Sequence, residues 1–260
     1  MSVVSVERDG HVLLIGVDRA DKRNAWNLAV IDEVGAAYER LATDDDLRAG
    51  VVYGHGDHFS AGLDLAEVAP KVAEEGPGAL SGSGSYDPFG MWGEPCPKPV
   101  VMAVQGIAFT LSIELALASD IVVAADDVRF NQLEIGRGII PFGGATVRAV
   151  RHLGWGNAMR FLLTAEEFGA AEAYRIGLVQ EVVAPGEQLA RATAIAHRIA
   201  AQAPLGVQGT LANARIARDQ GTDAAVEHLA GLLPGIMSSE DAAEGVRSFL
   251  ERRPGEYTGR

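Results

Sequence analysis

Residues 105–120 read QGIAFTLSIELALASD, a run of small and apolar residues that is interrupted by one carboxylate, Glu114. The run sits between two strand-like segments, PVVMAVQGIA and DIVVAADDVRF, and IELALASD itself has the character of a helix. This strand-helix-strand order is typical of an α/β protein. A charged side chain in such an apolar segment is costly when it is buried, so Glu114 requires an explanation.

The same alternation continues on the N-terminal side. VVSVER and HVLLIGVD flank Asp9-Gly10 and predict a hairpin. WNLAVIDEVGAAYERLATD has apolar residues at helical spacing and predicts an amphipathic helix, with Asn24 as its N-cap. LRAGVVYGHG then predicts a short buried strand that ends in glycines. We therefore expect an α/β architecture built as a parallel sheet or a spiral.

Two later regions differ from this pattern. Residues 70–95 are rich in Gly, Ser and Pro without periodicity, and we interpret them as a long loop, which in a compact chain is usually functional or mobile. Within it, Phe89, Met91 and Trp92 are candidates for an apolar lining, although ordinary packing explains them equally well. From about residue 187 onward the pattern is helical almost throughout, which predicts a region for packing or oligomerisation.

Composition and charge exclude several classes of protein. The 260 residues are 48% hydrophobic, and the net charge of −13 argues against a nucleic-acid-binding protein. Two cationic pairs, Lys22-Arg23 and Arg252-Arg253, could serve an anionic ligand or be ordinary surface charge. With one cysteine, no signal-like start and no unbroken apolar span, we expect a cytoplasmic protein that is not in the membrane.

Common catalytic and nucleotide-binding motifs are absent from the sequence. His55 and His58 lack further ligands at metal-binding spacing, so we interpret them as loop histidines that face solvent and expect no metal site. Ser60 is not part of a GxSxG motif. The glycines near residues 82–84 and 136–138 fall short of a phosphate or dinucleotide fingerprint, so ATP and NAD are not indicated.

A set of other segments makes sense together. SAGLDL places small residues before Leu63, where a main-chain N–H could face a ligand oxygen. Thr110 or Ser112 is expected at the N-cap of the next helix, with Glu114 in its first turn, and Glu134 follows 20 residues later. Each feature also has an ordinary explanation: a glutamate is favourable in a first helical turn, AGLD can be a tight turn, and Glu134 can be a surface residue or pair with Arg137. The residues alone predict an α/β enzyme or a ligand-binding protein.

At these positions the chain resembles the enoyl-CoA hydratase/isomerase (crotonase) superfamily over essentially its whole length. The matching pieces are RNAWN, HFSAGLDLAEV, KPVVMAVQGIAF with IELALASDIVVAADDVRF, LEIGRGIIPFGGAT, AEEFGAAEAYRIGLVQEVV and FLERRP. The resemblance implies a spiral core of repeated β-β-α turns over residues 1–195 and a helical trimerisation region over residues 196–260. It also implies a homotrimer or a dimer of trimers.

The resemblance also implies an enoyl-CoA hydratase of fatty acid and lipid metabolism. The main-chain N–H groups of Leu63 and Leu111 would form an oxyanion hole for the thioester oxygen of an acyl-CoA. Glu114 would orient and deprotonate water, and Glu134 would give a proton to C2. Coenzyme A is part of the substrate, and no other cofactor is implied.

Residues matching the family's substrate-binding segments, together with neighbours of the two glutamates, are Lys22, Arg23, Ala25, Ala61, Gly62, Asp64, Leu65, Trp92 and Phe142. The chain departs from the family at Thr110-Leu111-Ser112, where a glycine triplet is usual, and at Phe142, where glycine is frequent. Because leucine lacks glycine's freedom at positive φ, we expect a reshaped oxyanion hole at Leu111 or a narrowed acyl pocket.

Two alternatives to a hydratase remain at this stage. An enoyl-CoA isomerase, or another crotonase-type acyl-CoA enzyme, could work with Glu134 alone. A non-catalytic acyl-CoA-binding paralogue is also possible if the altered turn has destroyed the oxyanion hole.

Overall fold

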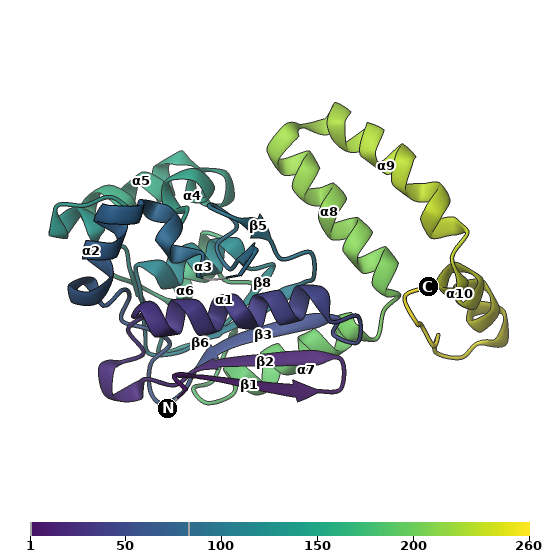
Figure 1. Cartoon of the computed structure of the whole chain (residues 1–260), viewed down its shortest axis with the longest axis horizontal. Helices are drawn as coiled ribbons and strands as arrows, with labels where there is room; N and C mark the ends of the chain where they lie inside the picture. Colours follow the sequence, from purple (N-terminus) through teal and green to yellow (C-terminus); the bar gives the residue numbers. More distant parts are fainter. Residues whose placement is uncertain (1, 83) are drawn as a thin grey trace.

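A six-stranded sheet forms the centre of the computed structural model, which describes residues 2–82 and 84–260 (Figure 1). Its strand order is β1-β2-β3-β6-β8-β11, with β1 and β2 antiparallel and the other neighbours parallel. The strands of this sheet are β1 (Val4–Asp9), β2 (Val12–Val17), β3 (Ala49–Gly54), β6 (Val100–Val104), β8 (Ile121–Ala125) and β11 (Glu181–Val183). The predicted hairpin around Asp9-Gly10 and the α/β fold are therefore confirmed.

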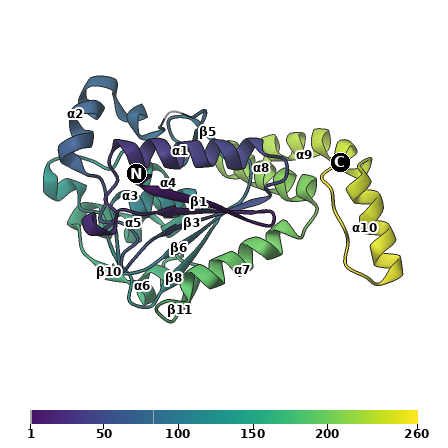
Figure 2. The ribbon, with the colours of Figure 1, turned by 60° about the horizontal axis from the view of Figure 1, so that its bottom comes forward.

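Helices cover both faces of this sheet, because its central strands are apolar on both sides. Val51 and Ala103 pack towards Ala196 of α7, whereas Val52 and Met102 belong to the larger cluster on the opposite face. The helices are α1 (Leu28–Thr43), α2 (Leu65–Glu75), α3 (Leu111–Ala118), α4 (Ala145–Leu153), α5 (Trp155–Thr164), α6 (Ala170–Arg175), α7 (Gln188–Ala200), α8 (Pro204–Gln220), α9 (Thr222–Met237) and α10 (Glu240–Glu251). Figure 2 shows α1 and α7 on opposite sides of the strands.

A second set of short strands lies beside the main sheet and carries the segments singled out in the sequence. In it β9 (Arg129–Asn131) pairs in parallel with β7 (Ile107–Phe109) and antiparallel with β10 (Phe168–Gly169). Two isolated bridges, Ser60 with Ala108 and Trp26 with Leu63, extend this arrangement. Three loops that are distant in sequence are thereby brought side by side.

The remaining short elements connect the main ones. They are the 3-10 helices η1 (Ala20–Lys22), η2 (Pro77–Leu80) and η3 (Glu134–Arg137), and the paired strands β4 (Tyr86–Asp87) and β5 (Glu94–Pro95).

Two local predictions were wrong. The N-cap of α1 is Asn27, whose side chain accepts a hydrogen bond from the N–H of Val30, and not Asn24. Asn24 is instead fully buried, and its amide group binds Arg19, His55 and His58. Residues 70–75, expected to be loop, belong to α2, which continues past Pro70.

The chain after α7 consists of helices that extend away from the sheet (Figures 1 and 2). Helix α7 itself packs on the sheet and runs through residue 195, so the proposed division there falls inside a helix. Helix α8 is joined to the main body by Arg215, which donates to the carbonyl of Cys96 and to Asp120. Of the helices described, none combines the length and the apolar character needed to cross a bilayer.

Ser60 offers a test of how the loops are held together. Its buried hydroxyl donates to the carbonyl of Asn24 (2.7 Å) and accepts from the N–H of Gly62 (3.1 Å). Because Ser60→Ala leaves both backbone groups unpaired, we expect it to lower the free energy of unfolding by about 2 kcal/mol. Urea denaturation measures this, with the exposed Ser238→Ala as the control. Equal effects of the two substitutions would contradict this role for Ser60.

Candidate active site

Glu114 lies in the first turn of α3 and is only 3% exposed. Its Oε1 accepts hydrogen bonds from the N–H groups of Gly143 (2.8 Å) and Ala145 (3.1 Å), at the start of α4. The carboxylate thus joins the N-terminal ends of two helices. The predicted position of Glu114 in the first turn of a helix is confirmed.

Burial has the largest effect on the pKa of Glu114. The two hydrogen bonds and the nearby Arg148 lower its pKa, but loss of solvation outweighs them and raises the pKa to about 7. The positive end of α3 acts in the same direction as the hydrogen bonds and is likewise insufficient. Glu114 can therefore exchange a proton near neutral pH.

Glu134 begins η3 and is 7% exposed. Its Oε1 accepts from Nε2 of Gln132 (2.8 Å), whereas its Oε2 is buried without a hydrogen-bond partner in the described part of the chain. Burial, and secondly the charge of Glu114, raise the pKa of Glu134 to about 7. The two ordinary explanations of Glu134, a surface carboxylate and an ion pair with Arg137, are excluded, because Glu134 is buried and forms no ion pair with Arg137 in the described part of the chain.

The charge of Glu114 opposes ionisation of Glu134, which adds to the effect of burial on Glu134. With both pKa values raised to about 7, each carboxyl can hold or release a proton near neutral pH. One carboxyl can then act as an acid while the other acts as a base.

The two predicted main-chain donors lie on segments that meet. Leu63 follows Gly62, and Leu111 follows Thr110, whose Oγ1 lies against Gly62. Neither the N–H of Leu63 nor that of Leu111 has a protein acceptor among residues 2–82 and 84–260. Two main-chain donors are thus left for a ligand, one of them at the N-terminus of α3, whose fourth residue is Glu114.

The residue with positive φ in this turn is Thr110, and not Leu111. Thr110 has φ 51° and ψ −108°, whereas Leu111 is the first residue of α3. Leu111 is buried in the apolar cluster, so its side chain contributes to the core. The positive φ of this turn thus lies one residue before Leu111, and the expectation of a reshaped oxyanion hole or a narrowed acyl pocket stays a prediction.

The predicted CoA-binding cations lie beside the Ala61–Leu63 segment. The N–H of Ala61 donates to the carbonyl of Arg23 (2.9 Å), and the N–H of Trp26 donates to the carbonyl of Gly62 (2.8 Å). Lys22 and Arg23 are exposed, and their side chains form no ion pair within the described ranges. Their charges are therefore available to an anion near this segment.

The remaining predicted binding residues are distributed around the same segment. Ala25 and Ala61 are half-buried and Leu65 is 38% exposed. Asp64 precedes α2 and forms an ion pair with Arg19 (3.0 Å). Asp64 is thus engaged within the protein.

The apolar candidates of the 70–95 region divide into two groups. Phe89 is fully buried and packs against Trp26 at 5.9 Å between ring centroids, so it belongs to the core. Trp92 is 46% exposed, and its Nε1 donates to the carbonyl of Phe142 (2.8 Å), next to Gly143. This hydrogen bond joins the loop to the segment that holds Glu114.

The C-terminal cations and the two loop histidines lie elsewhere. Arg253 pairs with Glu244 and Glu251 at the end of α10, and Arg252 caps that helix, away from α3 (Figure 1). His55 and His58 are half-buried and hydrogen-bonded to Ser5 and to the N–H of Ile107, so the expectation that they face solvent was wrong. No group of three or more His, Cys, Asp or Glu suited to a metal ion occurs in the part of the chain described.

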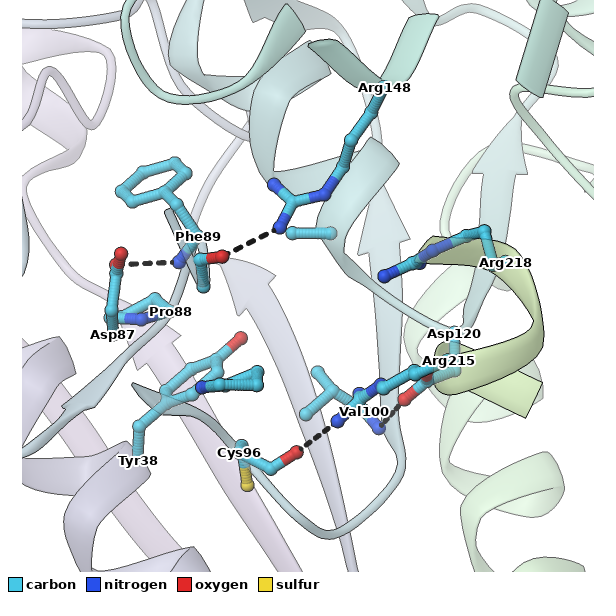
Figure 3. Close-up of a pocket in the computed structure, with 13 residues that line it drawn as sticks. Tyr38, Asp87, Pro88, Phe89, Cys96, Val100, Asp120, Arg148, Arg215 and Arg218 are labelled. Carbon is cyan, nitrogen blue, oxygen red and sulfur yellow. Dashed lines mark hydrogen bonds and ion pairs between the residues drawn. The ribbon is translucent and has the colours of Figure 1, made fainter. Parts of the chain in front are cut away.

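Arg148 was missed in the sequence. It extends from α4 and donates to the carbonyl of Gly90 (3.0 Å), at the edge of a cavity of about 30 Å³ (Figure 3). Arg215 and Arg218 of α8 line the same cavity, together with Tyr38 and Asp120. Arg148 therefore lies between Glu114, whose pKa it lowers, and the C-terminal part of α8.

Gly143 and Gln132 were missed too. A β-carbon on Gly143 would lie 2.6 Å from Oε2 of Glu114, so only glycine fits there. The pair Gly143-Gly144 before a helix was a visible signal, but its relation to Glu114 depends on the fold. Gln132, which binds Glu134 from two residues away, had no signal in the sequence.

Comparison with known proteins matches the sequence and the fold of this chain to one family. Residues 7–260 match the family model described as enoyl-CoA hydratase/isomerase. The chain is 33% identical to enoyl-CoA hydratase EchA19 of Mycobacterium tuberculosis, covering 98% of this chain and 96% of that protein. It is 32% identical to 2,3-dehydroadipyl-CoA hydratase of Escherichia coli, covering all of both chains.

A solved structure is also similar. The crystal structure of a probable enoyl-CoA hydratase/isomerase from Mycobacterium abscessus superimposes with a TM-score of 0.96 at 50% identity, covering 99% of each chain. The crotonase fold expected from the resemblance is therefore confirmed.

The raised pKa of Glu134 predicts a pH-dependent gain in stability for Glu134→Gln. Because the folded protein holds this proton more tightly than the unfolded chain, ionisation destabilises the fold increasingly from pH 4.5 to 7, and fully above. Relative to wild type, we expect the variant to gain roughly 3 kcal/mol between pH 4.5 and pH 8. Denaturant unfolding at both pH values measures this, with the exposed Glu227→Gln as control. A gain independent of pH would refute the prediction.

Proposed function

The chain belongs to the enoyl-CoA hydratase/isomerase family, and from this we propose that it is an enoyl-CoA hydratase, which adds water across the C2–C3 double bond of a 2-enoyl-CoA thioester. The observation that carries the proposal is the pair of buried carboxyls, Glu114 and Glu134, both with a pKa raised to about 7. The hydratase names of its relatives support the same reaction.

The N–H groups of Leu63 and Leu111 are proposed to hold the thioester oxygen. As the oxygen of water bonds to C3, the π electrons of the double bond move towards this oxygen and form an enolate. Two donors aimed at the developing charge stabilise it, and loss of one such donor typically costs about 3 kcal/mol. Their lack of a protein acceptor in the described structure supports this role.

Glu114 is proposed to orient water and to take its proton. The N–H groups of Gly143 and Ala145 fix one carboxylate oxygen, which sets the direction of the carboxylate. Glu134 is proposed to give its proton to C2, and its Oε2, which lacks a partner in the described structure, is the atom suited to carry it. The pair keeps one proton in total, because Glu114 gains what Glu134 loses.

Lys22 and Arg23 are proposed to bind the phosphates of coenzyme A. Ala25, Ala61, Gly62, Asp64 and Leu65 would then line the path of the pantetheine chain, and Trp92 and Phe142 would border the acyl group. The hydrogen bond from Ala61 to Arg23, which holds the cations beside the oxyanion hole, supports this assignment. The chemistry uses only groups of the chain and of the substrate.

An enoyl-CoA isomerase is the second candidate. It moves a double bond by proton transfer alone and can work with one carboxyl. The isomerase is favoured by Oε2 of Glu134, which has no hydrogen-bond partner in the described structure. In Glu114, by contrast, Oε1 already accepts hydrogen bonds from two main-chain N–H groups.

A homotrimer or a dimer of trimers is also proposed, with residues 196–260 as the oligomerisation region and residues 1–195 as the core. Large apolar side chains exposed on α9 and α10 support it, among them Met237, Val246, Phe249 and Leu250.

Substitution of each glutamate distinguishes the two activities. If the protein is a hydratase, Glu114→Ala and Glu134→Ala should each reduce kcat for hydration at least about 100-fold, as expected when a positioned acid or base is lost. Spectrophotometric assays over short, medium and long 2-enoyl-CoAs, including 2,3-dehydroadipyl-CoA, measure this. Isomerase activity retained by Glu114→Ala would favour the second candidate. Binding of CoA esters without turnover of any of them would contradict both the hydratase and the isomerase proposals.

Charge reversal tests the CoA site. We expect Lys22→Glu with Arg23→Glu to raise KM for enoyl-CoA about tenfold or more at low ionic strength while kcat changes little, because uniform binding is lost. The matched control reverses Arg252, which also carries an exposed cation. An unchanged KM in the double variant would refute the role.

A further inference from the structure

Thr110 stands out among residues with left-handed backbone geometry. In the described chain the non-glycine residues with positive φ are Arg23, Asn24, Thr110, Ala165 and Arg252. Thr110 alone among them is β-branched, and its ψ of −108° lies outside the left-handed helical region. Such a conformation persists only where the surroundings enforce it.

The surroundings of Thr110 can be identified. Its N–H donates to the carbonyl of Asn131 (2.8 Å), and its carbonyl accepts from the N–H of Ile113 (2.9 Å). Its Oγ1 is buried and has no hydrogen-bond partner among the residues described. This hydroxyl packs against Gly62, where a β-carbon would lie 3.4 Å from Cβ of Thr110 and still closer to its Oγ1.

The contact joins the two halves of the oxyanion hole. Gly62 directly precedes Leu63, and Thr110 directly precedes Leu111, so the touching residues share peptide bonds with the two donors. On its other side Gly62 is held by Ser60, through its N–H, and by Trp26, through its carbonyl. The contact between the Thr110 side chain and Gly62 is therefore one residue away from each of the two N–H groups.

We propose that Thr110 is a positioning residue whose side chain, wedged against Gly62, sets the distance and direction between the Leu63 and Leu111 N–H groups. This inference rests on the proposed function, because it assigns a role in the same oxyanion hole. Glycine at residue 110 would accept the backbone geometry without strain, but it would leave the space beside Gly62 empty. The threonine therefore fixes the hole at the expense of backbone strain.

The test separates positioning from folding. We expect Thr110→Gly to keep the wild-type Tm or raise it, while kcat falls about tenfold or more with KM within about threefold, since a small displacement of donors is costly. Thr110→Ser keeps Oγ and should retain kcat within about threefold. Thr110→Val places a methyl group at the contact, and its kcat should fall as it does in Thr110→Gly. Ala165→Gly is the matched control: it relieves positive φ at the end of α5 and should leave kcat unchanged.

A spectroscopic measurement gives a second readout. Hydrogen bonds to the thioester oxygen polarise a conjugated enoyl-CoA and shift its absorbance to longer wavelength. Cinnamoyl-CoA bound to Thr110→Gly should show a smaller shift than when it is bound to wild type or to Thr110→Ser.

The outcomes are distinguishable from those that test the reaction itself. Wild-type protein that hydrates no enoyl-CoA would overturn the proposed function. An active wild type with equal kcat and equal spectral shift in Thr110→Gly would overturn the inference alone. A loss of kcat in Thr110→Gly that merely follows a lowered Tm would also overturn it, because that is what a structural role predicts.

Discussion

The carboxylate of Glu114, buried between the first turns of α3 and α4, is the constraint on which the site depends. Two main-chain N–H groups stabilise its charge, but they do not compensate for the loss of water around it. The protein therefore maintains an acidic group that is half ionised near neutral pH. A second buried carboxyl, Glu134, raises the electrostatic cost of ionisation further. The sheet and its helices hold both carboxyls in place in spite of this cost.

The sheet contributes to the site indirectly, by aligning loops. Ser60 bonds to Asn24 and Gly62, and it bridges to β7, so the loops after β2, β3 and β6 are fixed with respect to one another. The groups on these loops that are proposed to face the ligand belong mostly to the main chain. Their positions consequently depend on buried partners several residues away.

The regular parts of the fold could be predicted from the sequence because they follow local rules. The Asp9-Gly10 hairpin and the helix that carries Glu114 each showed their own periodicity or turn residues. Asn24 was mistaken for a cap because its role is tertiary: its side chain binds backbone groups of another loop. Phe89 and Arg148 had no local signal, since their surroundings, Trp26 and Gly90, become neighbours only after folding. The family resemblance supplied the candidate site as a set, and spacing alone had left it open.

The carboxylate of Glu114 occupies the space that a side chain at residue 143 would need, and the absence of a side chain at Gly143 leaves that space open. A single methyl group there would displace the carboxylate and leave the rest of the fold little changed. Residue 143 is therefore closed to every side chain for as long as Glu114 keeps its present position. A change of residue type at position 143 in a descendant sequence would consequently report a rearranged carboxyl at residue 114, even where the glutamate itself is retained.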